Sequence, residues 1–377
     1  MEANISVCIY SPSEKIWGGA QLYIERLCNY MNEKDIATVI ATSEPNKFDC
    51  KTLEMKPVSS KFRRFYSSFP FAQFMRRSEI NIIVLDGLSS LWLAPVFKIS
   101  GIQVVSLLHM PLQKKNSAGF GHSLIEYHLL RASSFFCDKI FTVNKNNIDV
   151  FPVKIEFVGN FISPWFFDEP KALKKYDLGI IARLVKVKNI PLFIKIVETL
   201  NAKSDRNITA LIVGDGEEKD SIIKSIKMAG LEGNIDLCEW VSRENLPIIY
   251  DSIKCFAITS HHEGFASTLL ESHARGVPAI TTRSAGFCAE FLEKTNKVTG
   301  ISFIPKDIES WEFQESVQAL IDNAEQYKND CISKAKLFNE DSVLGLISGS
   351  IESLLTKKKR MLSENTLCCN RARFGRR

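Results

Sequence analysis

Two glutamates with seven residues between them, Glu263 and Glu271, could serve one polar ligand. Glu263 lies in the turn after an apolar stretch with strand character, Cys255–Thr259, and Glu271 falls about two turns into the helix expected next. Gly264 allows a ligand to approach the backbone, and the free N–H groups at the start of a helix attract anions. An isolated acid pair of this spacing is most often an ordinary helix start, so the surrounding residues must decide.

Cations follow a second expected strand, Leu178–Ala182. Arg183 and Lys188 lie in the loop after it, from which positive charge can neutralise a departing phosphate. Lys186 is expected to be solvated. Alone, these three would be ordinary surface cations, and the glycine turn Val213–Glu217 would be an ordinary tight turn. Together with the acid pair, they indicate a phosphate-bearing ligand.

Candidates in the first half of the chain are fewer. Gly18 and Gly19 follow an expected strand, Ile5–Tyr10, and open a helical pattern whose backbone could face the same phosphates. His109 ends another apolar strand, Val104–Leu108, so it points to the ligand-binding edge of a sheet. A structural and a functional role for His109 both remain open.

These residues must be positioned by parallel sheets, because short apolar runs alternate with longer helical patterns along the whole chain. Strands are expected at Ile5–Tyr10, Thr38–Thr42, Ile80–Leu85, Val104–His109, Ile140–Asn144 and Ile155–Gly159, then at Leu178–Ala182, Ala210–Val213, Ile235–Glu239, Cys255–Thr259, Ala279–Thr282 and Ile301–Phe303. The fold class is therefore α/β, with two doubly wound, Rossmann-like domains facing across a cleft.

A length of 377 residues also favours two domains. A linker with two prolines, Ser163–Tyr176, suggests domains at 1–165 and 166–345, followed at 346–377 by a helix end and a basic tail without helical periodicity after Leu362. The apolar share of 45% and charged share of 24% are those of a globular protein. No apolar run reaches the roughly 20 residues of a membrane span, and no secretion signal is evident, so we expect a cytoplasmic protein.

The ten cysteines lack metal-ligand or redox spacing, and we expect free thiols and no metal site. The segment Lys61–Arg77 mixes five cations with six aromatic side chains. Two interpretations remain: peripheral contact with an anionic membrane, or a helical face packed on the first sheet. Nucleic acid is not expected as a partner, because no binding module accompanies the basic stretch.

The motifs and their order resemble those of retaining glycosyltransferases of family four, which have the GT-B fold. The resemblance covers Tyr176 to Phe303 and is carried by A-R-L-V-K-V-K-N, V-G-D-G-E, E-W-V-S-R-E-N-L and H-E-G-F-A-S-T-L-L-E-S-H-A-R-G-V-P-A-I-T-T. Four motifs in the same order are far more specific than any one of them. Ala182 and Asn189 depart from the family pattern, which often has glycine at both positions.

The resemblance implies a role for each candidate. Arg183 and Lys188 would hold the donor diphosphate, Glu263 the hydroxyls of the transferred sugar and Glu271 the nucleotide ribose. The His109 side chain would lie near the sugar. The remaining candidates would contact the donor or its base through backbone groups: Gly18, Gly19, Gly264, Phe265, Ala266, Trp240 and Val241.

The resemblance further implies transfer of a hexose-type sugar, with retention of configuration, from a nucleotide diphosphate sugar to a glycan or lipid-linked acceptor. The pathway would be that of a bacterial lipopolysaccharide, O-antigen or capsule, on the inner face of the cytoplasmic membrane. No cofactor or metal is expected, and the chain has no Asp-x-Asp pair of the kind that holds a nucleotide-bound cation. A sugar-nucleotide epimerase and a catalytically silent nucleotide-sugar-binding subunit remain alternatives.

Overall fold

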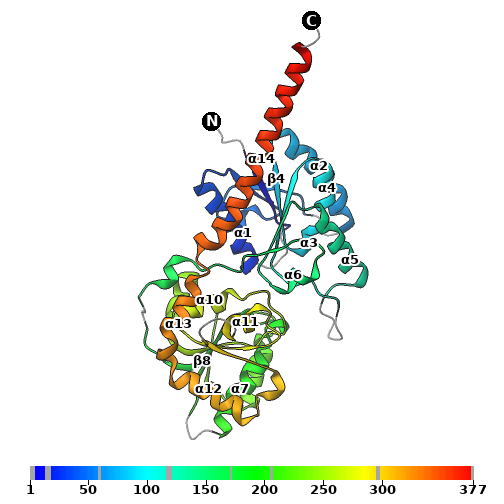
Figure 1. Ribbon diagram of the computed structural model, residues 1–377. Helices are drawn as coiled ribbons and strands as arrows, with labels where there is room; N and C mark the ends of the chain where they lie inside the picture. Colours follow the sequence, from blue (N-terminus) through cyan, green and yellow to red (C-terminus); the bar gives the residue numbers. More distant parts are fainter. Residues whose placement is uncertain are drawn as a thin grey trace. The chain divides into compact units, whose positions relative to one another are not determined.

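The computed structural model describes residues 5–12, 18–57, 61–115, 121–169, 172–203, 207–293 and 298–374. They form two compact units. Unit 1 comprises residues 1–158 and 343–377, and unit 2 comprises residues 159–342. Each unit has one sheet with helices on both of its faces (Figure 1).

The sheet of unit 1 has seven parallel strands in the order β3-β2-β1-β4-β5-β6-β7. They are β1 (Val7–Tyr10), β2 (Thr38–Thr42), β3 (Thr52–Glu54), β4 (Ile82–Asp86), β5 (Gln103–Leu108), β6 (Lys139–Thr142) and β7 (Glu156–Phe157). Val7 of the central β1 pairs with Thr38 on one side and with Ile82 on the other. The strand order therefore reverses between β1 and β4, the position where open α/β sheets bind ligands.

Helices cover this sheet because its strands are apolar on both faces. The helical elements are α1 (Gly19–Glu33), η1 (Pro45–Lys47), α2 (Lys61–Arg77), α3 (Leu88–Leu91), α4 (Ala94–Ile99), α5 (Leu124–Ser133), η2 (Ser134–Phe136), α6 (Asn146–Val150) and α14 (Glu340–Phe374). Ala72 and Met75 of α2 pack in one core with Cys8 and Tyr10. α1 and α14 lie on the other face (Figure 1).

The sheet of unit 2 has six parallel strands in the order β10-β9-β8-β11-β12-β13. They are β8 (Tyr176–Ile181), β9 (Ala210–Val213), β10 (Ile235–Cys238), β11 (Ile253–Ile258), β12 (Ala279–Thr282) and β13 (Gly300–Phe303). Leu178 of β8 pairs with Ala210 and with Cys255. The reversal of strand order thus lies between β8 and β11.

The helical elements of unit 2 are η3 (Pro164–Phe167), η4 (Lys186–Lys188), α7 (Ile190–Lys203), α8 (Lys219–Met228), η5 (Arg243–Asn245), α9 (Leu246–Asp251), α10 (Ser267–Ala274), α11 (Phe287–Glu293), η6 (Pro305–Asp307), α12 (Trp311–Asp322) and α13 (Ala324–Lys336). Side chains of α7, α8 and α12 share one large core with the sheet. α10 packs against α13.

The two sheets confirm the predicted α/β class with two Rossmann-like domains. One strand was missed, β3 at Thr52–Glu54, because it is short, lies at the sheet edge and has no buried side chain. β7 is shorter than the strand expected at Ile155–Gly159. Both differences concern edge strands, where burial leaves the weakest sequence signal.

The division of the chain differs from the predicted limits 1–165, 166–345 and 346–377. Unit 2 begins at residue 159 and ends at residue 342. Residues before 166 already belong to it, because the Ile162 N–H donates to the Phe338 carbonyl (2.8 Å) and the Ser163 hydroxyl donates to Glu340 (2.7 Å). These contacts are 176 or more residues apart in sequence, so no local pattern reports them.

The C-terminal segment also differs from the expected irregular tail. α14 continues to Phe374, well past Leu362. Its early side chains Leu344, Ile347 and Ile351 are buried in unit 1. Once packing fixes the first turns, each further residue adds one backbone hydrogen bond, so Lys, Arg and Leu residues extend the helix readily.

The basic aromatic segment forms the single helix α2, with Pro70 inside it. Ala72 and Met75 are buried in the core of unit 1, as the interpretation of a packed helical face expects. Tyr66 and Phe74 are exposed, and contact with a membrane stays a prediction. Among the described helices, none is both long and apolar enough to span a membrane.

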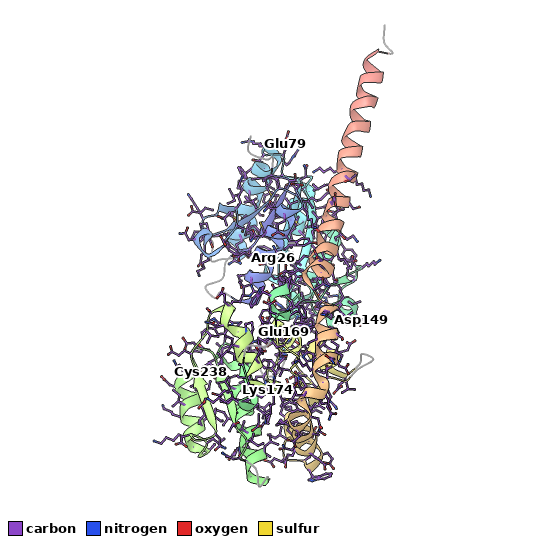
Figure 2. All side chains as sticks on the ribbon, turned by 90° about the vertical axis from the view of Figure 1, so that its left-hand side faces the viewer. Arg26, Glu79, Asp149, Glu169, Lys174 and Cys238 are labelled. Carbon is purple, nitrogen blue, oxygen red and sulfur yellow. The ribbon has the colours of Figure 1, made fainter. Side chains whose placement is uncertain are left out.

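The eight cysteines whose side chains the structure describes are free thiols, as expected. Five are buried, and Cys238, at the end of β10, is exposed (Figure 2). Within the described residues, no group of three or more His, Cys, Asp or Glu side chains is placed to hold a metal ion.

Candidate active site

The charged residues predicted for unit 2 lie on both sides of the point where its strand order reverses. Arg183 and Lys188 follow the carboxyl end of β8, and Glu263 and Gly264 follow the carboxyl end of β11. β8 and β11 are parallel neighbours, so both loops lie at the same edge of the sheet. We call this the donor edge.

An ion pair joins the two loops of the donor edge. Lys188 Nζ donates to Glu263 Oε1, and the side chains are only 21% and 13% exposed. Ser260 Oγ donates to the same carboxylate oxygen (2.8 Å), and Thr259 Oγ1 donates to the Lys188 carbonyl (2.9 Å). A partly desolvated cation and carboxylate are thus held in place, with the cation able to turn from the carboxylate to an anionic ligand.

Arg183 differs from Lys188 in having no partner. Its side chain is half-buried and, within the described part of the chain, makes no hydrogen bond or ion pair. A guanidinium in this position offers several unused donors to a phosphate. Lys186 is exposed, which agrees with the prediction that it is solvated.

Two glycines shape the Arg183 loop. A Cβ on Gly214 would lie 1.9 Å from the Ala182 carbonyl oxygen, and one on Gly216 would lie 2.5 Å from that of Leu184. Both glycines have positive φ, so the V-G-D-G-E turn is required for close backbone contact. Asn189 also has positive φ (50°), which explains how it replaces the family's glycine.

The turn Gly264–Ala266 is held from behind by α11. The Phe287 N–H donates to the Gly264 carbonyl (3.3 Å), and the Ala266 N–H donates to Cys288 Sγ (3.3 Å). The Phe265 ring is buried against Phe287, with centroids 4.9 Å apart. The amide of Ala266, expected to face the donor, is therefore engaged inside the protein.

Glu271 is buried in α10. Tyr250 donates its hydroxyl to Glu271 Oε2 (2.7 Å). Burial raises the pKa of Glu271, and the Tyr250 hydrogen bond and the nearby Arg243 charge oppose the rise. One carboxylate oxygen is thus oriented by Tyr250, which is suited to directing the other towards a ligand hydroxyl.

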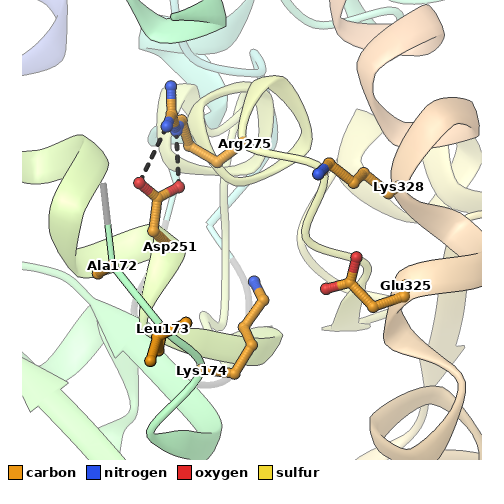
Figure 3. A pocket seen from close by; sticks show the side chains of 8 residues that line it. Ala172, Leu173, Lys174, Asp251, Arg275, Glu325 and Lys328 are labelled. Atoms are coloured by element: carbon orange, nitrogen blue, oxygen red, sulfur yellow. Dashed lines mark hydrogen bonds and ion pairs between the residues drawn. The ribbon is translucent and has the colours of Figure 1, made fainter. Parts of the chain in front are cut away.

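The end of α10 is fixed by a second buried contact. Arg275 forms a two-pronged ion pair with Asp251 (both N···O distances 2.9 Å) and donates to the carbonyls of Phe166 (2.9 Å) and Asp168 (2.6 Å) (Figure 3). Tyr250 and Asp251 are neighbours in α9. Two adjacent residues of α9 therefore set the position of the helix that carries Glu271.

The remaining candidates of unit 2 lie between β10 and η5. The Trp240 side chain is 56% exposed, and Val241 is half-buried. Both follow the carboxyl end of β10, so they share the donor edge with Arg183.

Unit 1 has a polar cluster at the corresponding reversal point of its own sheet. His109 Nε2 lies 3.0 Å from Asp86 Oδ1, and Ser11 Oγ donates to Asp86 Oδ2 (2.7 Å). Ser11 follows β1, Asp86 ends β4 and His109 follows β5. The His109 ring also meets the buried Tyr23 ring edge-on, with centroids 5.3 Å apart. His109 is therefore oriented by a carboxylate, an arrangement used to fix an imidazole tautomer.

The predicted glycines of unit 1 open the helix beside this cluster. Gly18 is the N-cap of α1, Gly19 is its first residue, and neither is buried. Tyr23, which packs on His109, lies one turn later in the same helix. The helix start and the histidine thus belong to one edge of the sheet.

Four functional candidates were not identified from the sequence: Asp86, Ser11, Tyr250 and Arg243. Asp86 carried a usable signal, since it is an acid at the carboxyl end of an apolar strand. Tyr250 and Arg243 lie in the stretch before β11 and acquire their meaning only when α9 and η5 pack beside α10.

A small pocket of unit 2 is unrelated to the donor edge. It has a volume of about 140 Å³ and is lined by Lys174, Asp251 and Lys328, among others (Figure 3). Lys174 precedes β8 and Asp251 precedes β11, so the pocket lies at the amino ends of the strands.

Comparison with known proteins agrees with this geometry. Residues 162–338 match the model of the family described as glycosyl transferases group 1. The match covers most of unit 2. The group 1 match includes Arg183, Lys188, Glu263 and Glu271, the charged residues that the structure places in unit 2.

Two curated relatives and one solved structure illustrate the similarity. The chain is 24% identical over 238 residues to a Campylobacter jejuni N-acetyl-D-galactosaminyltransferase named for a diNAcBac-PP-undecaprenol-linked substrate, covering 62% of each protein. It is 32% identical over 113 residues to the capsular polysaccharide biosynthesis glycosyltransferase CapM of Staphylococcus aureus, covering 29% of each. The structure of Anabaena HepE in complex with UDP superimposes with a TM-score of 0.71 and 16% identity, covering 93% of this chain and 100% of HepE.

The likeness to HepE supports the fold, and the predicted GT-B architecture of two Rossmann-like domains is confirmed. The alignments with curated relatives span between 13% and 66% of those proteins' lengths. They are glycosyltransferases or a related synthase by name, several of them of bacterial polysaccharide biosynthesis.

Proposed function

We propose that the protein is a retaining glycosyltransferase that moves a hexose-type sugar from a nucleotide diphosphate sugar to a glycan or lipid-linked acceptor. The observation that carries this proposal is the donor edge. It presents Arg183, which has no side-chain partner among the described residues, beside the Lys188–Glu263 ion pair, on both sides of the β8–β11 reversal.

The charges at this edge suit a diphosphate leaving group. Arg183 offers a guanidinium that no described residue engages, and Lys188 can exchange its contact with Glu263 for one with a phosphate oxygen. Glu263, released from Lys188, would accept hydrogen bonds from sugar hydroxyls, and Glu271 would accept from the ribose. Positive groups already in position cost little reorganisation when negative charge develops on the leaving group.

The reaction then proceeds on one face of the sugar. The bond from the anomeric carbon to the phosphate oxygen breaks as the bond to the acceptor oxygen forms, and the acceptor proton passes to the departing phosphate. Arg183 and Lys188 supply the positive charge that a divalent cation supplies in other glycosyltransferases. Metal independence is part of this proposal. His109, oriented by Asp86, would contact the transferred sugar.

The acceptor is proposed from the relatives' names and from surface chemistry. The C. jejuni relative is named for an undecaprenol-linked substrate, and several relatives are named for polysaccharide biosynthesis. Exposed Arg63, Arg76 and Arg77 lie on α2 with exposed aromatic residues, which suits peripheral contact with the inner face of the cytoplasmic membrane. We propose a lipid-linked acceptor in lipopolysaccharide, O-antigen or capsule synthesis.

The test is a panel of nucleotide diphosphate sugars, followed by thermal shift and by release of the nucleoside diphosphate. We expect one donor class to raise the melting temperature and to be turned over, with and without EDTA. Binding without any turnover would indicate a silent subunit. Interconversion of the donor sugar would indicate an epimerase, and a complete, magnesium-reversible loss in EDTA would overturn metal independence.

A further inference from the structure

Helix α5 (Leu124–Ser133) and the adjoining η2 turn (Ser134–Phe136) present large apolar side chains to solvent. Leu124 is 60% exposed, Ile125 76%, Leu129 58% and Phe135 65%. Single exposed hydrophobic residues are normal on a protein surface, but a contiguous set marks an interaction site. We call this set the α5 face.

The α5 face is one side of a helix whose other side is anchored. At about 100° per residue, Leu124, Ile125 and Leu129 of α5 fall within one arc of about 140°, which exposed His128 shares. Phe135 follows in the adjoining turn η2. Leu130 points the other way and is buried in the unit 1 core. The helix is therefore anchored in the core through Leu130, whereas Ile125 and Leu129 are exposed.

Cations border the α5 face. Lys114 Nζ lies 5.3 Å and Arg131 Cζ 5.7 Å from the centroid of the Tyr127 ring, which is half-buried. The acid of this helix, Glu126, is already paired with His122 (3.4 Å). An apolar face with basic residues at its margin is typical of helices that lie in the plane of a membrane interface.

The α5 face continues across neighbouring helices of unit 1. η2 packs against α4, and α4 packs against α2. α2, α4 and α5 follow one another along one side of unit 1 in Figure 1. Ile99 at the end of α4 and Phe69 on α2 are further exposed apolar side chains of these helices. The arginines of α2 add positive charge to the same helical layer.

We propose that the α5 face inserts into the interfacial region of an anionic bilayer, with Ile125, Leu129 and Phe135 among the acyl chains and Lys114 and Arg131 at the headgroups. This inference rests on the proposed function only for the lipid-linked acceptor. α2 contributes attraction through charge, whereas α5 contributes apolar burial. The two helices together provide the two signals that stable peripheral binding requires.

A second copy of the chain is a less favourable occupant. In a two-fold dimer through this face, the same patch would meet itself, so Arg131 and Lys114 of both copies would be brought together. The face offers no unpaired carboxylate of its own helix to offset them, since Glu126 is held by His122. Anionic lipid headgroups, by contrast, complement these cations.

The first experiment measures binding of the full chain to vesicles by sedimentation. Vesicles of phosphatidylcholine with phosphatidylglycerol are compared with phosphatidylcholine alone, using Ile125→Asp/Leu129→Asp and the matched control Ile223→Asp/Met228→Asp. The control positions are also exposed apolar residues, Ile223 at 47% and Met228 at 89%, on α8 of unit 2. We expect the α5 variant to lose at least about tenfold in partition coefficient on anionic vesicles, and the control to match the parent.

The second experiment reports insertion directly. Ile125→Trp should show a blue-shifted emission and quenching by lipids brominated in the acyl chain, but Ile223→Trp should not. Equal vesicle binding of the parent and the α5 variant, or an unquenched Ile125→Trp, would overturn the proposal. So would a parent that sediments as a dimer and becomes monomeric only in the α5 variant. Donor binding, measured by calorimetry without vesicles, tests the proposed function separately and should be the same in all variants.

Discussion

The polar edges of the two sheets differ in how they are built. At the donor edge of unit 2, Arg183, Lys188, Glu263 and Glu271 come from loops and a helix close to their motifs, and charges of both signs are present. At the edge of unit 1, Ser11, Asp86 and His109 come from three strands, and they present one carboxylate and one imidazole. Under the proposed function, unit 2 would stabilise the charge of the leaving group, whereas unit 1 would orient the imidazole ring of His109.

The largest expected effect concerns charge at the donor edge. Arg183→Ala should lower turnover by about 10²–10³-fold, as loss of one preorganised oxyanion donor does. The fold should be intact, because Arg183 makes no side-chain contact within the described residues. Steady-state kinetics with the donor identified by the panel would measure this.

Lys186→Ala is the matched control, since Lys186 lies in the same loop and is exposed. It should retain parental turnover. Similar losses in both variants, or none in Arg183→Ala, would remove the assignment of this loop to the leaving group.

The second prediction concerns the edge of unit 1. Asp86→Asn should lower turnover by about tenfold by loosening the orientation of His109. Binding of the nucleoside diphosphate alone should be unchanged, because the proposed diphosphate and ribose contacts belong to unit 2. Kinetics and calorimetry on the same preparation separate the two quantities.

Asp138→Asn provides the comparison for Asp86→Asn. Asp138 is another unit 1 carboxylate and is paired with Lys98 (2.5 Å), but it precedes β6 and so lies at the other edge of the sheet. Its loss should leave turnover unaltered. A drop in nucleotide affinity in Asp86→Asn would contradict the division of roles between the two edges.

The two edges also differ in how far the sequence could predict them. In unit 2, each motif follows its own strand within a few residues, so its order and chemistry are visible along the chain. In unit 1, Asp86 and His109 are 23 residues apart, and Ser11 lies 75 residues before Asp86. Their meeting depends on the order β1-β4-β5, which the alternation of strands and helices does not specify.

The same reason accounts for the other differences. The amide of Ala266 is satisfied by Cys288, 22 residues later, and Glu271 is oriented by Tyr250, 21 residues earlier. Class, sheets and most strands follow from local periodicity. Partners of buried polar groups follow from tertiary packing, which periodicity does not report.

The third prediction tests the division of labour inside the donor edge. Glu263→Gln should lower kcat/KM for the sugar donor by about tenfold and leave nucleoside diphosphate binding nearly unchanged. Glu271→Gln should weaken nucleoside diphosphate binding by about tenfold, because it removes a charged acceptor proposed for the ribose. Each variant is the control for the other. If both variants changed kcat/KM and nucleoside diphosphate binding equally, Glu263 and Glu271 would not have separate roles.

The last and smallest effect concerns the support beneath the donor edge. Lys334 of α13 is 4% exposed and donates to the Phe291 carbonyl (2.7 Å), the Leu292 carbonyl (3.0 Å) and Thr299 Oγ1 (3.0 Å). These carbonyls end α11, whose first residues hold Gly264 and Ala266. Burial lowers the pKa of Lys334 to about 8, and the nearby Cys331 and Asp330 oppose this decrease. His273 Nε2 lies 2.9 Å from Thr299 Oγ1, to which Lys334 also donates.

A lysine whose pKa is lower in the folded than in the unfolded chain binds fewer protons when folded, between pH 8 and its ordinary pKa of 10.5. The free energy of unfolding of the parent should therefore rise with pH across this window, relative to Lys334→Met, by up to about 1 kcal/mol per pH unit. Below pH 8 the difference between the two proteins should be constant. Urea unfolding at several pH values from 7 to 10 would measure it. Lys336→Met changes an exposed residue of the same helix and should match the stability of the parent at every pH. A pH-independent difference between the parent and Lys334→Met would show that Lys334 does not titrate in this range.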